Sequence, residues 1–185
     1  MTSISLSDDA ALLVIDVQKR LMKAMDADQM ERCIHATHTL IELAGECDAP
    51  IIYTEQYPDG LGPTEDQLLE ALQKYGAARV EKKAFDACSS PNFRDQLIEL
   101  PKRVIVCGME THVCVYTTVR ELIERRHDVV VPIDATISRT QANHHNGLQL
   151  MADAGATIAN YETLVFDALG SADHPGFKRF SKMVK

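Results

Sequence analysis

Apolar residues follow two different periods along this chain. Residues 11–16, ALLVID, are apolar up to the final Asp16, which is typical of a central parallel strand covered on both faces. From residue 28 to residue 46, apolar side chains recur every three or four positions, which predicts an amphipathic helix. Other short stretches rich in apolar residues predict further strands at residues 51–54, 79–83, 103–108, 128–134 and 156–160. Further helices are expected at residues 64–74, with Thr64 as the cap, and at 89–100, 111–126, 140–154 and 161–169.

This order of strands and helices indicates an α/β fold. Strand and helix alternate five or six times, which predicts three α/β/α layers with a mostly parallel sheet and right-handed crossovers. The 185 residues contain no linker, repeat or low-complexity segment, so we expect a single domain over residues 1–185. Residues 171–185 form a polar, basic C-terminal tail, and Phe177 and Phe180 are expected to anchor it to the body or to a neighbouring subunit.

Charge and composition narrow the class of partner. A net charge of -8 and a pI near 5.3, without a run of Lys or Arg, argue against nucleic acid and anionic membranes and favour a small-molecule substrate. No apolar run approaches the roughly 18 residues of a membrane span, and the first residues lack a secretory pattern, so a cytoplasmic location is expected. Five cysteines without a C-x-x-C pair predict free thiols.

Charged side chains follow two of the predicted strands. Ligands of open α/β sheets bind beyond the carboxyl ends of the strands, so Asp16 faces the expected site, unless it only caps the next turn. The strand at 79–83 delivers Lys82 and Lys83 to the same edge, where one of them is functional or both are solvated. The Pro- and Gly-rich loop 55–64 is expected at this edge as well.

Residues 104–115, VIVCGMETHVCV, place a thiol at the start of a helix. A β-branched run ends at Gly108, and a helical pattern begins near Thr111 with Cys114 in its first turn. Unpaired N–H groups and the positive end of the helix dipole stabilise a thiolate or an oxyanion there. Cys114 is therefore a candidate nucleophile, and the alternative is a small buried hydrophobic residue. The chain contains neither G-x-G-x-x-G nor a Walker loop, so no nucleotide cofactor is expected.

Three motifs in order carry a resemblance to a known family. LLVIDVQ, EKKAF and CGMETHVCV resemble the motifs of the isochorismatase-like cysteine hydrolase superfamily, over nearly the whole chain. TEQYPDGLG, DATISRTQANHH and ALGSADHPGFKRFSKMVK make the chain most similar to the isochorismatase domain-containing proteins. The resemblance implies a six-stranded parallel sheet flanked by helices, and a homo-oligomer that is a dimer, a tetramer or a larger ring.

The resemblance also implies a role for each motif residue. Asp16 would be the general base, Lys82 its cationic partner and Cys114 the nucleophile. Lys82 is preferred to Lys83 because the family places an aromatic residue three positions after its lysine, and Phe85 occupies that position. The ammonium group is expected to lower the pKa of both Asp16 and Cys114. A carboxylate can take the thiol proton but also repels a thiolate; we expect the first effect to dominate, so that Asp16→Asn would slow the alkylation of Cys114.

The same resemblance implies a cis peptide bond between Met109 and Glu110. Its expected use is to direct the backbone N–H of Glu110, together with that of Cys114, at a developing oxyanion.

The chain departs from two branches of the superfamily. Nicotinamidases bind a metal through an Asp-x-His loop after the second strand, and TEQYPDGLG contains no such motif. His144 and His145 are adjacent and would splay by roughly 100° on a helix, so no metal is expected. True isochorismatases, which cleave a vinyl ether, lack the nucleophilic cysteine.

The leading hypothesis is a hydrolase acting on a small amide, carbamoyl or related C–N bond. The alternative is a non-enzymatic interaction protein that retains the fold. A redox role is disfavoured because no resolving cysteine lies nearby in the sequence.

Several polar residues have weaker claims to the site. Gln18, Tyr57 and His112 are candidate substrate contacts or structural residues. Asp134 is expected to cap the loop after its strand. Arg139 would hold a substrate carboxylate or form an ion pair between subunits.

Overall fold

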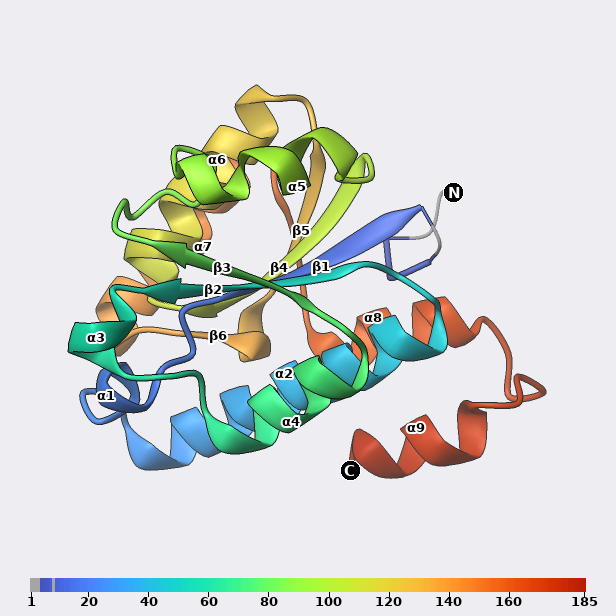
Figure 1. Cartoon of the computed structure of the whole chain (residues 1–185). Coiled ribbons are helices and arrows are strands. Elements are labelled where there is room, and N and C mark those ends of the chain that lie inside the picture. Colours follow the sequence, from blue (N-terminus) through green and yellow to red (C-terminus); the bar gives the residue numbers. More distant parts are fainter. Residues whose placement is uncertain (1–3, 8) are drawn as a thin grey trace.

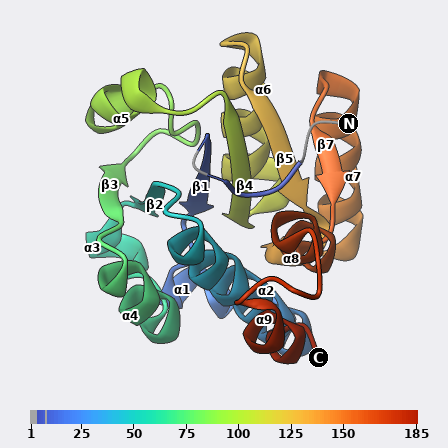
Figure 2. The ribbon, with the colours of Figure 1, turned by 90° about the vertical axis from the view of Figure 1, so that its right-hand side faces the viewer.

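The computed structural model describes residues 4–7 and 9–185, and strands within them form one parallel sheet. The strands are β1 (Ala10–Ile15), β2 (Ile51–Gln56), β3 (Ala78–Lys82), β4 (Arg103–Met109), β5 (Asp128–Pro132), β6 (Thr136–Ile137) and β7 (Thr157–Ala159). Their order is β3-β2-β1-β4-β5-β7, and the short β6 pairs with the end of β4 (Figure 2). The expected parallel α/β sheet is confirmed, with one strand more than the six expected.

The additional strand, β6, follows the segment expected as one strand at 128–134. β5 ends at Pro132, and a 3-10 turn, Ile133–Ala135, redirects the chain before β6 begins. β6 then aligns Thr136 with Gly108 and Ile137 with Met109. The prediction of a continuous strand to Asp134 was wrong at its end, and the residues after β6 are brought beside the end of β4.

Helices cover both faces of the sheet (Figures 1 and 2). One layer contains α2 (Ala27–Glu46), α4 (Asp66–Lys74) and α8 (Tyr161–Leu169), and the other contains α5 (Arg94–Glu99), α6 (Tyr116–Glu124) and α7 (Gln141–Ala154). Short helices α1 (Lys19–Met22) and α3 (Pro58–Leu61) lie near the carboxyl edge of the strands (Figure 1). Successive residues of β1 alternate between the two layers: Leu12 and Val14 pack in one apolar cluster, and Leu13 and Ile15 in the other.

Three helix starts differ from the expected ones. α5, expected from residue 89, begins at Arg94 after a 3-10 turn, Pro91–Phe93. Glu65, rather than Thr64, caps α4 by accepting a hydrogen bond from the Leu68 N–H, while the Thr64 hydroxyl donates to Glu55. The helix expected from 111 opens as a π-helical turn, Thr111–Val115, which continues into α6. α7 ends at Gly155 as expected, because this glycine adopts a left-handed φ of 108°.

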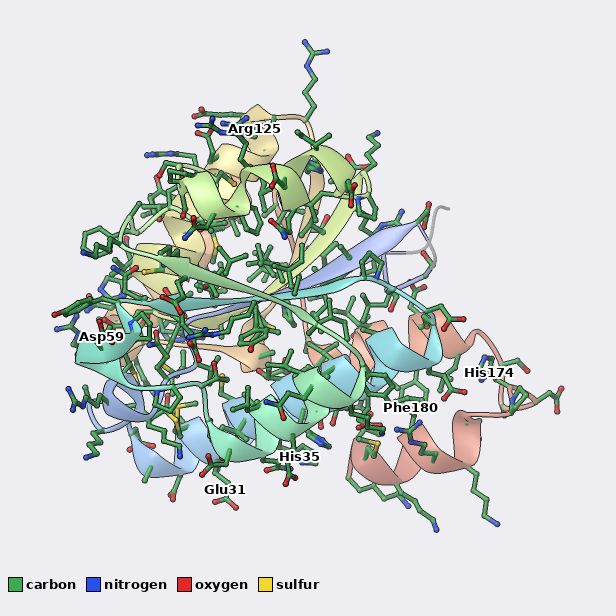
Figure 3. The ribbon with its side chains drawn as sticks, viewed as in Figure 1. Glu31, His35, Asp59, Arg125, His174 and Phe180 are labelled. Atoms are coloured by element: carbon green, nitrogen blue, oxygen red, sulfur yellow. The ribbon has the colours of Figure 1, made fainter. Side chains whose placement is uncertain are left out.

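The C-terminal tail packs on the body of its own chain. Its helix α9 (Phe177–Met183) lies against α2, and Phe180 is fully buried (Figure 3). Arg179 forms ion pairs with Glu42 and Glu46 of α2. In the part of the chain that the structure describes, no helix is long and apolar enough to cross a membrane.

The strand order reverses between β1 and β4, and the expected site lies at this junction. Ile15, the last residue of β1, is paired with Gly108 near the end of β4. Gly108 has a φ of 114°, and a Cβ there would lie 2.0 Å from the Ile15 carbonyl oxygen. Because crevices at such reversal points are the usual ligand sites of open α/β sheets, residues after β1 and β4 are placed for chemistry.

Candidate active site

Asp16, Lys82 and Cys114 meet at the carboxyl edge of the sheet. Asp16 follows β1 with a φ of 51°, Lys82 ends β3, and Cys114 lies in the π-helical turn after β4. The Lys82 side chain passes the end of β2, so that its Nζ lies 2.6 Å from Asp16 Oδ2, and both side chains are fully buried. The Cys114 thiol lies close enough to both side chains for their charges to act on it. Because β1, β3 and β4 are parallel, their carboxyl ends bring the three groups together.

Residues at the end of β2 complete the polar network. The Thr54 hydroxyl donates to Asp16 Oδ1 at 2.7 Å, and Lys82 Nζ donates to Gln56 Oε1 at 2.8 Å. Lys82 also contacts the carbonyl oxygens of Ala84 and Phe85. The sequence analysis missed Thr54 and Gln56, although both belong to the strand between β1 and β3. Their signal was register: Thr54 pairs with Ile15, and Gln56 with Lys82.

The pKa of Cys114 differs from the sequence expectation. Burial, followed by the negative charge of Asp16, raises the pKa of the Cys114 thiol to about 12, and Lys82 only partly opposes this rise. Lys82 does lower this pKa, as expected, but burial and Asp16 outweigh it, and the sequence did not predict that net rise. Near neutral pH the resting group is a thiol, and a neighbouring base must take its proton when it attacks.

The turn that carries Cys114 is organised around Glu110. The Met109–Glu110 peptide bond is cis, as the resemblance implied. The carbonyl oxygen of Glu110 accepts hydrogen bonds from the N–H groups of Val113 and Val115. We call residues 110–115 the Cys114 turn.

Arg139 has neither of the two roles that the sequence left open, a contact to a substrate carboxylate or an ion pair between subunits. It forms an ion pair with Glu110 of its own chain, with Nη2 2.6 Å from Oε1. The buried Glu110 carboxylate also accepts the backbone N–H of Arg139 at 3.0 Å. Asp134 accepts the N–H of Tyr161 and so caps the start of α8 rather than only its own loop.

The weaker candidates are placed around the site. Gln18 is fully buried, and its amide bonds backbone groups of Gln56 and Gly62, which is a structural arrangement. The ring of His112 contacts Ser138 Oγ at 3.0 Å. Tyr57 is half exposed and lines a hollow of about 370 Å³ beside Lys82.

Lys83 does not take part in the central ion pair. Its side chain is exposed, and its Nζ lies 5.8 Å from the centre of the Tyr57 ring. Lys82 is thus the lysine that reaches Asp16. Across the described residues, 4–7 and 9–185, no group of three or more His, Cys, Asp or Glu side chains is arranged to hold a metal ion.

The fold and the strand-end cluster define an α/β protein with a cysteine, an aspartate and a lysine at the reversal of its sheet. Residues 10–163 match the model of the isochorismatase domain, and the chain belongs to this family. The resemblance inferred from the sequence motifs is thereby confirmed. The chain has the isochorismatase-like hydrolase fold.

Individual relatives cover nearly the whole chain. It is 32% identical over 179 residues to the secreted isochorismatase effector Isc1 of Phytophthora sojae, covering 95% of this chain and 84% of the relative. It is 31% identical over 183 residues to isochorismatase domain-containing protein 2 of Bos taurus, covering 97% and 85%. Because one relative is described as secreted, a cytoplasmic location for this chain stays a prediction.

Solved structures show the same fold. The MAR1 ribonuclease from Caenorhabditis elegans superimposes with a TM-score of 0.86 at 32% identity, covering 97% of this chain and 92% of that one. The Escherichia coli YcaC gene product, described as an octameric hydrolase of unknown specificity, gives a TM-score of 0.87 at 22% identity, covering 99% and 92%. At that identity the second likeness concerns the fold alone.

Proposed function

We propose that this protein is a cysteine hydrolase that cleaves a small amide, carbamoyl or related C–N bond through a thioester on Cys114. The observation that carries the proposal is the buried Lys82–Asp16 ion pair, whose two charges act on the nearby Cys114 thiol. A base, a cation and a nucleophile that converge in one site are the parts that acyl transfer needs.

The first half of the reaction forms the thioester. As the Cys114 sulfur attacks the carbonyl carbon, its proton passes to the nearby Asp16 carboxylate. The tetrahedral intermediate collapses by breaking the C–N bond, and Asp16 returns the proton to the departing nitrogen. Lys82 donates to one oxygen of Asp16 and balances its charge, and the second oxygen accepts the Thr54 hydroxyl.

The second half releases the acid. Water attacks the thioester carbonyl while Asp16 takes its proton, and collapse of this second intermediate expels the sulfur as the proton returns to it. We assign the backbone N–H groups of Glu110 and Cys114 to stabilising both oxyanions. In other acyl-transfer enzymes, loss of one such donor lowers the rate by on the order of 10² to 10³.

The test is a panel of small amides and carbamoyl compounds, with mass spectrometry of the intact protein to detect an acyl adduct. Cys114→Ala is expected to abolish both turnover and the adduct while retaining the fold. Cys88→Ala is the matched control, because Cys88 and Cys114 are each 7% exposed and pack in the same apolar cluster. Normal turnover in Cys114→Ala would end the covalent mechanism.

A protein without activity would give a different result. If neither turnover nor an adduct is found, the interaction-protein alternative gains support. Because one relative is named a ribonuclease, RNA belongs in the panel, although a net charge of -8 disfavours it as a substrate.

Assembly belongs to the same proposal. Phe85, next to the Lys82 loop, is 61% exposed, and burial against a second copy would remove this aromatic surface from water. We therefore retain the homo-oligomer as a prediction, which sedimentation velocity tests directly.

A further inference from the structure

We propose that Arg139 is a positioning residue for the reaction, because it holds Glu110 and thereby orients the peptide group that faces the developing oxyanion. This inference rests on the proposed function, and it adds to that function a residue outside the Asp16, Lys82 and Cys114 cluster.

The Cys114 turn is held from outside by one segment, residues 138–147. Three consecutive turn residues each have a side-chain partner there: Glu110 with Arg139, Thr111 with His144 at 2.9 Å, and His112 with Ser138 at 3.0 Å. Gly147 of α7 completes the contact, since a Cβ at this glycine would lie 2.9 Å from backbone atoms of residues 111 and 112.

The contact between Glu110 and Arg139 is the most extensive of the three. The guanidinium donates from Nε at 3.0 Å and from Nη2 at 2.6 Å, and the Arg139 backbone N–H donates at 3.0 Å. Burial alone would raise the pKa of Glu110, but these bonds and the charge of Arg139 hold it below its usual value. Glu110 is therefore an anchored carboxylate.

Glu110 is anchored at both ends. Its side chain is fixed by Arg139, and its carbonyl oxygen accepts the N–H groups of Val113 and Val115 within the turn. Its own N–H is one of the two proposed oxyanion donors. An anchor on each side of the residue limits rotation of this peptide group, which is the preorganisation that an oxyanion site requires.

The fold brings Arg139 to this position through the small strand β6. Pairing of β6 with Gly108 and Met109 places residues 138 and 139 directly beside Glu110. The Arg139 side chain is 58% exposed, so it reaches the buried carboxylate from the surface. Replacing the guanidinium group therefore leaves no cavity in the core, and the substitution should act mainly on Glu110.

The test compares two reactions of Cys114. Acylation by p-nitrophenyl acetate passes through a tetrahedral oxyanion, whereas alkylation by iodoacetamide does not. Both depend on the thiolate fraction in the same way, so their ratio reports on oxyanion stabilisation and needs no natural substrate. Arg139→Gln is expected to lower this ratio by about 10- to 100-fold. The upper limit is the rate loss typical when one oxyanion donor is removed or a reacting group is displaced by about 1 Å, because this variant only loosens a donor.

Three variants make the comparison specific. Cys114→Ala gives the background of the other thiols. Arg125→Gln is the matched control, because Arg125 is also a half-exposed arginine in an ion pair but lies at the far end of α6 (Figure 3). Arg139→Lys keeps the charge without the planar fork and should recover part of the ratio. It also serves as the second test if Arg139→Gln fails to fold.

The outcomes separate the two proposals. A wild-type Cys114 that p-nitrophenyl acetate does not acylate above background would overturn the nucleophile assignment, and this inference with it. A wild type that is acylated, with an unchanged ratio in Arg139→Gln, would overturn the positioning role alone. Equal losses in both reactions would mean that Arg139 only supports the fold.

Discussion

At the scale of single residues, Asp16 has two opposing effects on Cys114. Its carboxylate lies near the thiol and is placed to accept its proton, but its charge raises the pKa of the same thiol. From the sequence, proton acceptance was expected to dominate. The structure favours repulsion in the resting state, because Lys82 is already paired with Asp16 at 2.6 Å.

Asp16→Asn is therefore expected to speed the alkylation of Cys114 near neutral pH and to impair turnover. Removing the carboxylate charge lowers the pKa of Cys114 and leaves Lys82 free to pair with the thiolate, whereas the amide cannot take a proton. Asn is also suited to the φ of 51° at this position. The measurement is the rate of iodoacetamide alkylation against pH.

The pH dependence of alkylation shows whether Asp16 raises or lowers the pKa of Cys114. In the wild type, a pKa of about 12 keeps Cys114 protonated, so the rate should rise about tenfold per pH unit through the neutral range. In Asp16→Asn the rise should level off at a lower pH. Asp59→Asn, at an exposed carboxylate on α3, is the control (Figure 3). Slower alkylation in Asp16→Asn would show instead that Asp16 promotes the thiolate.

At the scale of elements, the site depends on how closely β1 and β4 approach each other. Gly108 lets the end of β4 pass Ile15 with backbone against backbone. The chain can then turn into the Cys114 turn directly beside Asp16. A side chain at this position would push β4, which leads to Cys114, away from β1, which leads to Asp16.

Gly108→Ala is expected to destabilise the protein by more than about 3 kcal/mol, because a backbone clash adds to the cost of the positive φ. Gly76→Ala is the matched control. Gly76 has a φ of 65° with nothing within 4 Å of its missing Cβ, so only the strain of about 1–2 kcal/mol applies. Urea unfolding of both variants measures the difference, and equal losses would refute the clash.

At the scale of the whole molecule, the site opposes the stability of the fold. Lys82 and Asp16 are charged groups removed from water at the centre of a well-packed sheet. Their mutual attraction offsets the cost of desolvation, but apolar or neutral partners would not incur that cost. We therefore expect the pair to add little to the net stability of the fold.

This predicts a non-additive pair of variants. Lys82→Met should cost about 3–5 kcal/mol in the free energy of unfolding, because it leaves a buried carboxylate without its cation. Adding Asp16→Asn should recover most of that loss. Both variants should be inactive. A double variant less stable than Lys82→Met in urea unfolding would show that the ion pair itself stabilises the fold.

The sequence by itself determined the layers and the strand-end residues. Hydrophobic periodicity is a local property, so it predicts strands and helices directly from the sequence. A residue such as Asp16, at the end of an apolar run, lies at the sheet edge in any parallel arrangement. The motifs around Lys82 and Cys114 then indicated the family. Most element boundaries were right within a few residues for the same reason.

Only the tertiary structure decided the properties that depend on neighbours distant in the chain. Thr64 does not cap α4, because its hydroxyl and its N–H both donate hydrogen bonds to Glu55, nine residues away. Arg139 forms an ion pair with Glu110 because the pairing of β6 with β4 places the two residues side by side. The pKa of Cys114 was set by burial and by charges from two other strands. Burial and Coulomb interactions act through space, and sequence patterns do not encode those distances.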